Sequence, residues 1–573
     1  MQTGSTQIGL HKAQKIAQLQ WGFRCTIAAY ALVISWISRY YINPDGVSYL
    51  DMGDLYWAGD WKAALNSYWS PLYSWMTGLI FRLTKPTMRW EYPEVHLLNF
   101  FICIAALLCF EFFWRELLAA KSEGELQGTS RARAWTLGYL LFACVSFTCN
   151  SLNQSNDNVA LVTPDFLVSA LVYLASGMML RLSSGRMRGV SAALLGVTLG
   201  LGYLAKAAML PFALVVLATM LGVVIKRRSG AQLLGLTLLC FLVIAAPLIA
   251  ALTYNNHRFT FGDAGKLNVA WFVNDVTPAH IHWQGDGRAQ AQPLHTTRKL
   301  LNWPEVYEFA TPVAGTYPAW YDPTYWWAGV DTHMHPAHEI VRLRKNLFMI
   351  GSYLTGYAGQ LTSLVLLMTL MSDWSRRSWR QRTKLFPILI PAVAMCVLYG
   401  MVIWEPRYTV GFLLVVCGAL CASACNFEKE HRPKVMQAAI LTLGVLVLWG
   451  AIVNVHGNYR SKEFWARQVV AAEKLRAMGI EPGTRVAVIG DGFEEEYWAR
   501  LARFKIVAEV PRSLETGDSA SAFWNADQAE KQVVLDALKS TGATIVVAQV
   551  PLRVMPSGWM QVNDAGLAVY SFR

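Results

Sequence analysis

Residues Arg39–Tyr73 decide the fold class of this chain, and they read RYYINPDGVSYLDMGDLYWAGDWKAALNSYWSPLY. The stretch follows almost directly on the hydrophobic segment Cys25–Ile37, which has the apolar character of a membrane helix. It carries four carboxylates and is crowded with Trp and Tyr side chains. Because charge at the mouth of a membrane helix is costly to place there, we interpret the stretch as functional. Asp45, just after the helix ends, is its first candidate.

The composition is that of a membrane protein. Of the 573 residues, 54% are hydrophobic and only 15% are charged, whereas soluble domains carry about a quarter charged residues. About eleven apolar runs reach the length of roughly 18 residues that crosses a bilayer. Their approximate centres are Val33, Ala105, Phe142, Val172, Leu195, Val215, Leu238, Leu354, Ala392, Leu414 and Leu446. The sequence therefore predicts a polytopic α-helical membrane protein.

Basic residues gather in six segments beside or between these runs. All six fall on one side of the membrane if the chain threads back and forth from a cytoplasmic N-terminus. The clusters lie around Lys12, Arg131, Arg186, Lys226, Arg377 and Lys429. Positive segments favour the cytoplasm, so we expect an inner-membrane protein with a cytoplasmic N-terminus and an extracytoplasmic C-terminus. Topology also explains the net charge of +12, and no nucleic-acid partner is predicted.

Two domains are expected. Residues 1–456 would form the transmembrane domain, with a long outer loop at 255–342, and residues 457–573 a small α/β domain outside the cytoplasm. In the second domain, segments 485–490, 506–510, 544–549 and 567–572 have the pattern of short strands, and 526–540 that of a helix. The turn Gly490-Asp491-Gly492 is typical of nucleotide-binding loops but lacks G-x-G-x-x-G. A structural or acceptor-docking role is therefore favoured over nucleotide binding.

Metal sites are not predicted. The ten cysteines fall in or beside predicted spans, which argues against disulfides and against a cysteine metal site. Three histidines and Glu339 lie within residues 333–339, but H-E-x-x-H is absent and Pro336 interrupts helical spacing.

Asp45 stands in the first outer loop within Asn43-Pro44-Asp45-Gly46. Pro44 ends the preceding helix and Gly46 permits a sharp turn, so the carboxylate would be fixed at the outer membrane boundary. A general base needs such a fixed position close to the proton that it takes. The alternative is that Asp45 only caps the helix expected over Val47–Trp57.

The rest of this loop is interpreted mainly as structure. Asp51 and Asp54 would share one face of the expected helix, either solvated or binding a cation, and solvation is favoured. Asp60 would cap a helix that starts at Trp61. The segments Trp61–Trp69 and Ser70–Leu83 have the pattern of helices that lie in the membrane interface, which suits a substrate that is part lipid.

More charged residues are expected at the outer face. Asp165 follows Thr163-Pro164 at the start of a span and is either functional or a helix cap. Lys206 lies between two spans, and Glu405-Pro406-Arg407-Tyr408 occupies a later outer turn. Arginine suits bidentate phosphate binding and lysine suits point-charge neutralisation. The alternatives for Arg407 are a salt bridge to Glu405 or snorkelling to the interface.

The long outer loop contains an aromatic run at residues 317–327, which includes Tyr321 and Trp326. Such aromatic density suits stacking on sugar rings or contact with lipid headgroups.

Together these features resemble the GT-C-type integral membrane glycosyltransferases, whose relatives include protein O-mannosyltransferases and the aminoarabinose transferases of lipid A. The resemblance covers residues 20–425 and rests on four features. These are an Asp in the first outer loop, interfacial helices, a long outer loop after the seventh span and an E-x-R-Y turn. It implies a GT-C-like fold, a polyprenyl-phosphate-linked sugar donor and an extracytoplasmic acceptor that is a glycan, a lipid or a protein.

The resemblance makes Asp45 the expected catalytic base, and Lys206 and Arg407 the expected ligands of the donor phosphate. Further acidic or substrate-binding candidates are Asp165, Glu405, Tyr408, Tyr321 and Trp326. No Asp-Asp or Glu-x-Asp pair stands at Asp45, so no cofactor is predicted and a divalent cation is left open.

In the expected reaction, Asp45 deprotonates an acceptor hydroxyl, which attacks the anomeric carbon as the polyprenyl phosphate leaves. A single displacement would invert the anomeric centre. Two other classes are kept. A transporter or flippase of a lipid-linked saccharide would bury charges in mid-span, whereas these spans are nearly free of them. A non-catalytic envelope-assembly scaffold would depend on residues 457–573.

Overall fold

A computed structural model describes most of the chain. The described residues are 2–121, 128–148, 159–228, 230–274, 298–329 apart from 310 and 313, 336–355, 383–424, 433–513, 517–550, 555–562 and 566–572, together with 295 and 332.

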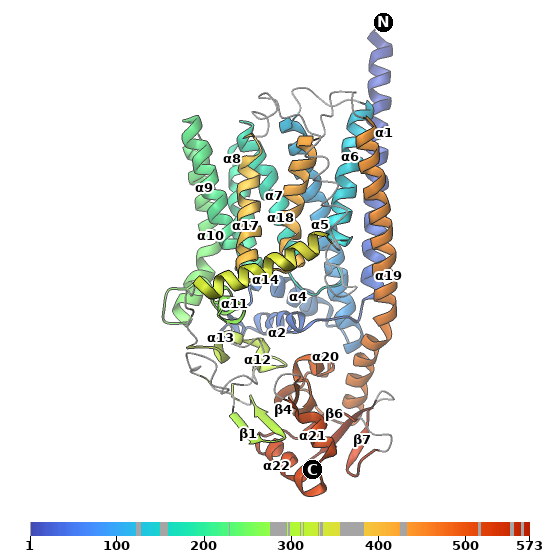
Figure 1. Ribbon diagram of the computed structural model, residues 1–573, viewed down its shortest axis with the longest axis vertical. Helices are drawn as coiled ribbons and strands as arrows, with labels where there is room; N and C mark the ends of the chain where they lie inside the picture. Colours follow the sequence, from blue (N-terminus) through green and yellow to red (C-terminus); the bar gives the residue numbers. More distant parts are fainter. Residues whose placement is uncertain are drawn as a thin grey trace.

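Long helices form a bundle that makes up the larger part of the molecule (Figure 1). They are α1 (Gln2–Ile37), α5 (Met88–Lys121), α6 (Gly128–Ala143) with the π-helical turn Cys144–Thr148, α7 (Asp165–Ser183), α8 (Gly189–Ala205), α9 (Met209–Arg227), α10 (Ala231–Asn255), α17 (Phe386–Val402), α18 (Pro406–Ala424) and α19 (Pro433–Ala477). Among the described residues, six helices are long and apolar enough to cross a membrane, namely α5, α7, α9, α10, α18 and α19. The predicted class of helical membrane protein is confirmed, whereas the number of spans stays a prediction.

The span predicted around Leu354 lies partly outside the described residues and stays a prediction. Residues up to Thr355 belong to α14 (Pro336–Thr355), which Figure 1 shows lying obliquely across the bundle, and residues 356–382 lie outside the described part. Two polar side chains hold α14 against the end of α17, because Asn346 donates to the Gly400 carbonyl and Arg342 to the Val402 carbonyl. A helix anchored by polar groups in this way is amphipathic rather than apolar on all sides.

The two ends of the chain lie at opposite ends of the bundle (Figure 1). The predicted basic segments after α7 and after α9 lie side by side, since Arg227 donates to the Leu182 carbonyl at 2.9 Å. The spans are less free of charge than the sequence suggested. Inside the bundle, the guanidinium of Arg24 lies 2.6 Å from the Glu111 carboxylate, which also accepts from the Tyr139 hydroxyl at 2.6 Å.

Short helices fill the space between the bundle and the C-terminal part of the chain. They are α2 (Pro44–Ala58), α3 (Trp61–Ala64), α4 (Pro71–Thr84), α11 (Ala264–Phe272), α12 (Pro318–Tyr321) and α13 (Pro323–Trp326). Proline opens α2 and α4, as is favoured at a first helical position. Gly59 ends α2 in a left-handed conformation with φ of 87°.

The helix predicted over Trp61–Trp69 is much shorter in the structure. Asp60 caps α3 as expected by accepting from the Ala63 amide, but α3 ends at Ala64. Beyond it, the Asn66 side chain accepts from the amides of Tyr68 and Trp69. These local bonds compete with the helical backbone and replace it.

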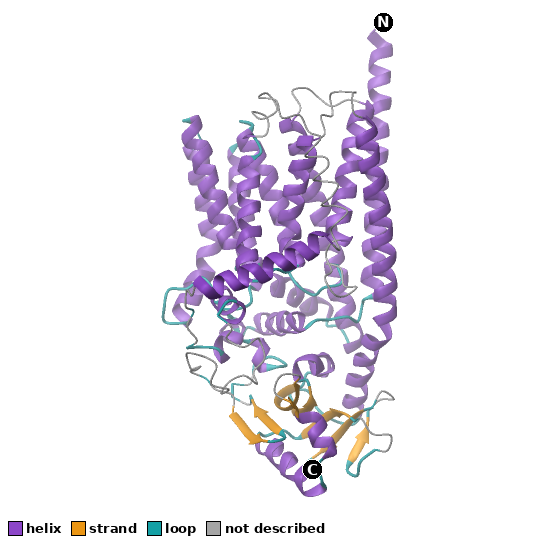
Figure 2. Ribbon diagram, in the orientation of Figure 1, coloured by secondary structure: helices purple, strands orange, loops and turns teal. Residues whose placement is uncertain are grey.

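Strands gather at the end of the molecule opposite the N-terminus (Figure 2). They are β1 (Arg298–Asn302), β2 (Glu305–Glu308), β3 (Arg485–Gly490), β4 (Lys505–Ser513), β5 (Gly517–Asp518), β6 (Ile545–Gln549), β7 (Trp559–Gln561) and β8 (Leu567–Ser571). The order is β1-β2-β4-β3-β6-β8-β7, with β5 paired to β4. Among the described strands, only the β3-β4 and β3-β6 pairs are parallel. The four predicted strand segments are confirmed as strands.

The sheet also takes two strands from the long outer loop, which the sequence did not suggest. Strand β2 pairs antiparallel with β4, with Tyr307 opposite Glu509 and Glu308 opposite Ala508. This pairing covers an edge of β4 that would otherwise present unpaired backbone groups. Helix α19 meanwhile runs unbroken through the expected boundary at 456/457. The domain division therefore stays a prediction.

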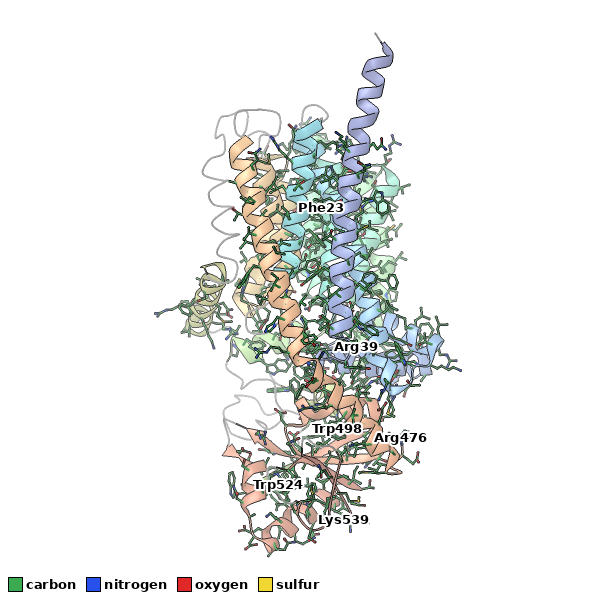
Figure 3. The ribbon with its side chains drawn as sticks, turned by 90° about the vertical axis from the view of Figure 1, so that its right-hand side faces the viewer. Phe23, Arg39, Arg476, Trp498, Trp524 and Lys539 are labelled. Carbon is green, nitrogen blue, oxygen red and sulfur yellow. The ribbon has the colours of Figure 1, made fainter. Side chains whose placement is uncertain are left out.

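Helices cover both faces of this sheet. Residues alternate along β3, so that Val486 and Val488 pack into the main core while Ala487 and Ile489 pack into a second core. The main core includes α20 (Gly492–Ala502) with the buried Trp498, and the second includes α21 (Ser519–Asn525) and α22 (Gln528–Ser540). Figure 3 shows Trp498 nearer to the bundle than Trp524 of α21, so α20 lies on the face toward the bundle.

Helices α2 and α4 cross at two glycines. A Cβ on Gly78 would lie 2.5 Å from the Gly53 carbonyl oxygen and 2.5 Å from Trp57 Cδ1. The close approach fixes the position of α2, which carries Asp45.

Gly78→Ala should destabilise the protein by about 1–3 kcal/mol, because the new methyl overpacks this crossing. The melting temperature of the purified protein in detergent tests the expectation. Gly222→Ala in α9 is the matched control, since a Cβ there meets no atom within 4 Å. Equal melting temperatures for the two variants would contradict the tight crossing.

Candidate functional site

Asp45 lies in the first turn of α2, and neighbouring residues fix that turn. Asn43 accepts a hydrogen bond from the Val162 amide at 3.1 Å. A Cβ on Gly46 would lie 2.8 Å from Val162 Cβ, so only glycine permits this approach. Because the segment around Val162 leads into α7, these contacts bring the start of α2 close to Asp165.

The carboxylate of Asp45 is held at both oxygens. Its Oδ1 accepts from Trp320 Nε1 at 3.2 Å, and its Oδ2 lies 3.2 Å from Arg407 Nη2. No side-chain cap bond forms at the start of α2, where Asn43 holds the cap position. The interpretation of Asp45 as a mere helix cap is therefore wrong, since its oxygens bind side chains distant in sequence.

Trp320 is a member of the site that the sequence reasoning missed. Its carbonyl accepts from Ser48 Oγ at 3.0 Å and from Trp69 Nε1 at 3.2 Å, which orients the indole toward Asp45. The only signal in the sequence was its place in the aromatic run 317–327, where nothing separates it from its neighbours.

Asp165 forms the second ion pair of the site. Its Oδ1 lies 2.6 Å from Lys206 Nζ, and its Oδ2 accepts from Thr163 Oγ1 at 2.9 Å. Lys206 follows directly on α8 in extended backbone, outside the helix. Burial lowers the pKa of the Lys206 ammonium, and the negative charge of Asp165 opposes that shift.

Tyr408 joins the two ion pairs. Its ring centroid lies 3.6 Å from Lys206 Nζ, and its hydroxyl accepts from Arg407 Nη2 at 3.1 Å. We call Asp45, Asp165, Lys206, Arg407 and Tyr408 the charged cluster. They come from the first turns of α2, α7 and α18 and from the turn after α8. The tertiary fold thus brings together five positions that the sequence had suggested separately.

Glu405 stands beside the charged cluster. Burial raises the pKa of its carboxyl group, and Arg407 opposes that shift. Among the described residues, Arg407 forms its ion pair with Asp45 rather than with Glu405. In place of the salt bridge to Glu405 that was the alternative for Arg407, this arginine makes a contact between α18 and α2.

The two aromatic candidates of the long outer loop hold other parts of the fold. The Tyr321 hydroxyl donates to the Ala63 carbonyl at 2.7 Å, and Trp326 Nε1 donates to the Pro318 carbonyl at 3.0 Å. Both side chains are buried. The structure does not bring Tyr321 or Trp326 into the charged cluster, and their substrate-binding role stays a prediction.

The other carboxylates of α2 bind arginines, so the prediction that they are solvated is wrong. Arg500 contacts Asp51 at 2.6 Å and Asp54 at 2.7 Å. Glu91 of α5 accepts from Arg500 Nε at 2.8 Å and from Arg503 Nη2 at 2.7 Å. We call these five residues the arginine network. Although burial raises the pKa of Asp54, Arg500 and Arg503 outweigh it and leave that pKa below its ordinary value.

The turn that was compared with nucleotide-binding loops is filled by protein atoms. The Gly492 amide donates to Glu509 Oε2 at 3.1 Å, and the Phe493 amide donates to Asp491 Oδ1 at 3.0 Å. A carboxylate thus lies where a phosphate would bind at a helix N-terminus. The structural or acceptor-docking role that the sequence favoured over nucleotide binding stays a prediction.

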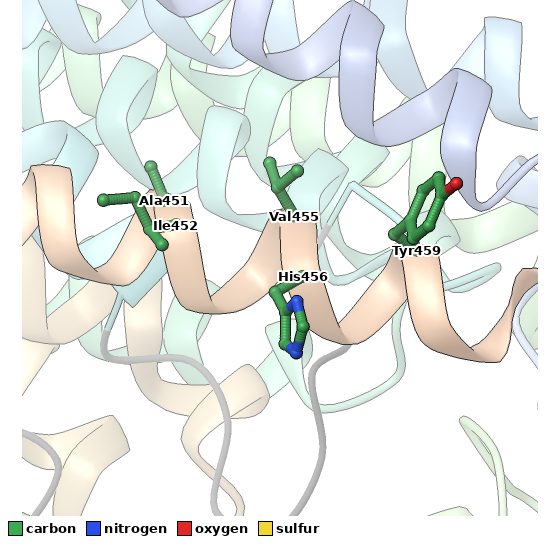
Figure 4. A pocket seen from close by; sticks show the side chains of 5 residues that line it. All are labelled: Ala451, Ile452, Val455, His456 and Tyr459. Carbon is green, nitrogen blue, oxygen red and sulfur yellow. The ribbon is translucent and has the colours of Figure 1, made fainter.

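A hollow on α19 lies outside the charged cluster. Figure 4 shows a hollow along α19 whose described lining residues are Ala451, Ile452, Val455, His456 and Tyr459. In the described part of the chain, no group of three or more His, Cys, Asp or Glu side chains is arranged to hold a metal ion.

Comparisons with known proteins support the fold. No protein-family model and no curated protein sequence matches this chain. The crystal structure of ArnT from Cupriavidus metallidurans in the apo state covers 96% of this chain and 98% of its own length, with a TM-score of 0.51 and 14% identity. The crystal structure of the same protein bound to undecaprenyl phosphate covers 96% of this chain and 97% of its own length, with a TM-score of 0.51 and 14% identity.

An oligosaccharyltransferase from Archaeoglobus fulgidus, solved with Zn and sulfate, covers 91% of this chain and 68% of its own length, with a TM-score of 0.47 and 13% identity. At such identities, likeness shows the fold alone, and ArnT supports it with a TM-score above 0.5. The GT-C fold expected from the sequence is thereby confirmed, and the chain is an integral membrane protein.

Lys206→Met should destabilise the protein by about 3 kcal/mol or more, because it leaves the Asp165 carboxylate buried without its cation. Adding Asp165→Asn should restore part of that loss, since the unpaired charge is removed. Melting temperatures of the single and double variants measure the coupling. Lys226→Met, at the exposed end of α9, is the matched control. Simple additivity of the two substitutions would show that the pair is not coupled.

Proposed function

We propose that this protein transfers a sugar from a polyprenyl-phosphate-linked donor to an acceptor outside the cytoplasm, with Asp45 as the general base. The observation that carries the proposal is the charged cluster, in which one fixed carboxylate stands beside two cations at one end of a GT-C fold. In a displacement reaction, the carboxylate would take the proton of the nucleophile, and the cations would stabilise the negative charge on the leaving group.

The contacts of Asp45 suit a base. Trp320 and Arg407 each bind a different carboxylate oxygen, so the orientation of the group is fixed. A carboxylate can accept about four hydrogen bonds, so lone pairs remain for a substrate proton. The side chain is 18% exposed, which leaves it reachable from outside. An acceptor hydroxyl that loses its proton to Asp45 would attack the anomeric carbon of the donor.

The two cations suit a leaving phosphate. Lys206 and Arg407 are each 22% exposed, and both keep N–H donors beyond those in their ion pairs. Charge develops on the phosphate oxygen as the glycosidic bond breaks, and prearranged cations stabilise it. ArnT, which shares the fold, has been crystallised with undecaprenyl phosphate. We extend that ligand class to this chain as part of the proposal.

The proposal also covers the stereochemistry of the reaction, its substrates and the side of the membrane where it takes place. The reaction would invert the anomeric centre, because the acceptor attacks from the face opposite the leaving phosphate. The sugar is a hexose or a pentose, and the acceptor is a glycan, a lipid or a protein. We place the charged cluster outside the cytoplasm because the predicted topology puts the C-terminal end there.

Asp45→Asn should lower the rate of transfer about 10²–10⁴-fold, because the amide cannot take the proton. Undecaprenyl phosphate should bind as well or better, since Arg407 loses its anionic partner. The assay follows release of undecaprenyl phosphate from donors that carry a hexose or an aminopentose, with native cell membranes as the acceptor source. Native mass spectrometry measures binding.

The matched control for Asp45→Asn is Asp60→Asn, which changes an exposed cap that asparagine can also form. We expect it to keep the wild-type rate. Full transfer by Asp45→Asn would rule out Asp45 as the base, and a lack of release from every donor by the wild-type protein would contradict the proposed reaction.

Binding of undecaprenyl phosphate should weaken as the pH rises. Burial lowers the pKa of Lys206, so this lysine loses its proton at a lower pH than an ordinary lysine near 10.4. Above that pH the site has one cation fewer, and the affinity should drop roughly tenfold or more. Lys206→Arg should stay protonated and bind independently of pH over the same range. Identical pH profiles for the two proteins would contradict phosphate binding by Lys206.

A further inference from the structure

We propose that α20, in the C-terminal part of the chain, is a positioning element for Asp45, with Arg500 and Phe493 as its positioning residues. The inference rests on the proposed function, because it assigns these residues to the base of that reaction. Neither residue belongs to the charged cluster. Each acts through a side chain that does, or through the helix that carries Asp45.

The first connection is ionic and reaches α2. Arg500 is buried, with its side chain 2% exposed, and its Nη1 lies 2.6 Å from Asp51 Oδ1. Its Nε lies 2.8 Å from Glu91 Oε1 at the start of α5. One guanidinium therefore ties α2 to α5. Because Asp51 lies less than two turns after Asp45 on α2, this tie restrains the helix that presents the base.

The second connection is aromatic and reaches the indole at the base. The ring of Phe493 packs edge-on against Trp320, with centroids 5.1 Å apart. Trp320 donates to Asp45 Oδ1. Phe493 and Arg500 are seven residues apart, so they lie on the same face of α20. That face of α20 therefore contacts both α2, which carries Asp45, and Trp320, which donates a hydrogen bond to Asp45.

Asp51 links the two connections. Besides Arg500, it accepts from the amide of Thr316 at 2.6 Å and from its hydroxyl at 3.0 Å. Thr316 lies four residues before Trp320 and accepts at its carbonyl from the Ile506 amide of β4. The loop that carries Trp320 is thus anchored at Thr316, to α2 through the Asp51 carboxylate and to the sheet through the backbone of β4.

Two unsatisfied polar atoms at the contact between α20 and α2 indicate that this contact positions α2 more than it stabilises the protein. Arg500 Nη2 and Glu496 Oε1 are buried, and neither has a hydrogen-bond partner among the described residues. Such groups cost stability, and apolar residues would join the two parts of the chain more strongly. What the charged pairs add is a defined direction, because the guanidinium fork binds carboxylates in fixed orientations.

The experiment compares Arg500→Gln, Arg500→Lys and Phe493→Leu in the transfer assay described above. We expect Arg500→Gln to lower kcat about 10²-fold, the effect of a displacement near 1 Å, with KM for the donor and binding of undecaprenyl phosphate unchanged within twofold. Arg500→Lys keeps the charge and should restore part of kcat. Arg512→Gln, on β4 and 53% exposed, is the matched control and should match wild type.

A second readout does not depend on activity. Hydrogen exchange of the amides in residues 44–58 should be faster in Arg500→Gln than in wild type, because α2 loses its tie. Phe493→Leu leaves the arginine network intact, so it tests the aromatic connection even if Arg500→Gln does not fold. It should lower kcat roughly tenfold or more, within the cost of misplacing a catalytic group.

Three outcomes overturn the inference. One is wild-type kcat in both Arg500→Gln and Phe493→Leu under conditions where Asp45→Asn is inactive. Another is an unchanged exchange rate in α2 of Arg500→Gln, whatever Asp45→Asn shows. Full activity of Asp45→Asn instead contradicts the proposed function. If kcat fell while undecaprenyl phosphate also bound more weakly and the melting temperature also dropped, the residues would have a structural role only. That result would also reject the positioning role.

Discussion

The buried guanidinium of Arg500 is the contact on which the arrangement of this protein depends. It meets Asp51 and Glu91, two buried carboxylates that belong to different helices at one end of the bundle. Without a cation, two negative charges would lie close together in a medium of low dielectric, which costs far more than it would in water. The helix α2, the start of α5 and the helix α20 therefore hold each other in one geometry.

The charged cluster follows the same principle, with a different result. Asp45 and Asp165 each neutralise one cation, so the cluster is nearly balanced in charge before a substrate arrives. Unlike Arg500, Lys206 and Arg407 remain partly exposed. In the proposed reaction, a phosphate would therefore reach them without first breaking a fully buried ion pair. The arginine network is suited to holding structure, whereas we propose that the charged cluster binds and releases an anion.

Much of the fold could be predicted because apolar periodicity and charge bias act locally. The bundle helices and the strands β3, β4, β6 and β8 were found in this way. The shortened helix at Trp61 was missed because Asn66 bonds to nearby amides, a competition that periodicity does not report. Strands β1 and β2 were missed because only β2 joins them to the rest of the sheet, and its partner β4 lies about two hundred residues later in the chain.

The sequence by itself determined that the chain is a helical membrane protein, and it pointed to Asp45, Lys206 and Arg407 as the residues to examine. These conclusions depend on composition and on order along the chain. Only the tertiary structure decided which charges pair, that Trp320 binds Asp45, and that Asp51 meets Arg500 instead of water. Ion pairs form across distances of hundreds of residues, and burial sets their strength, so neither can be read from the neighbours of a residue in sequence.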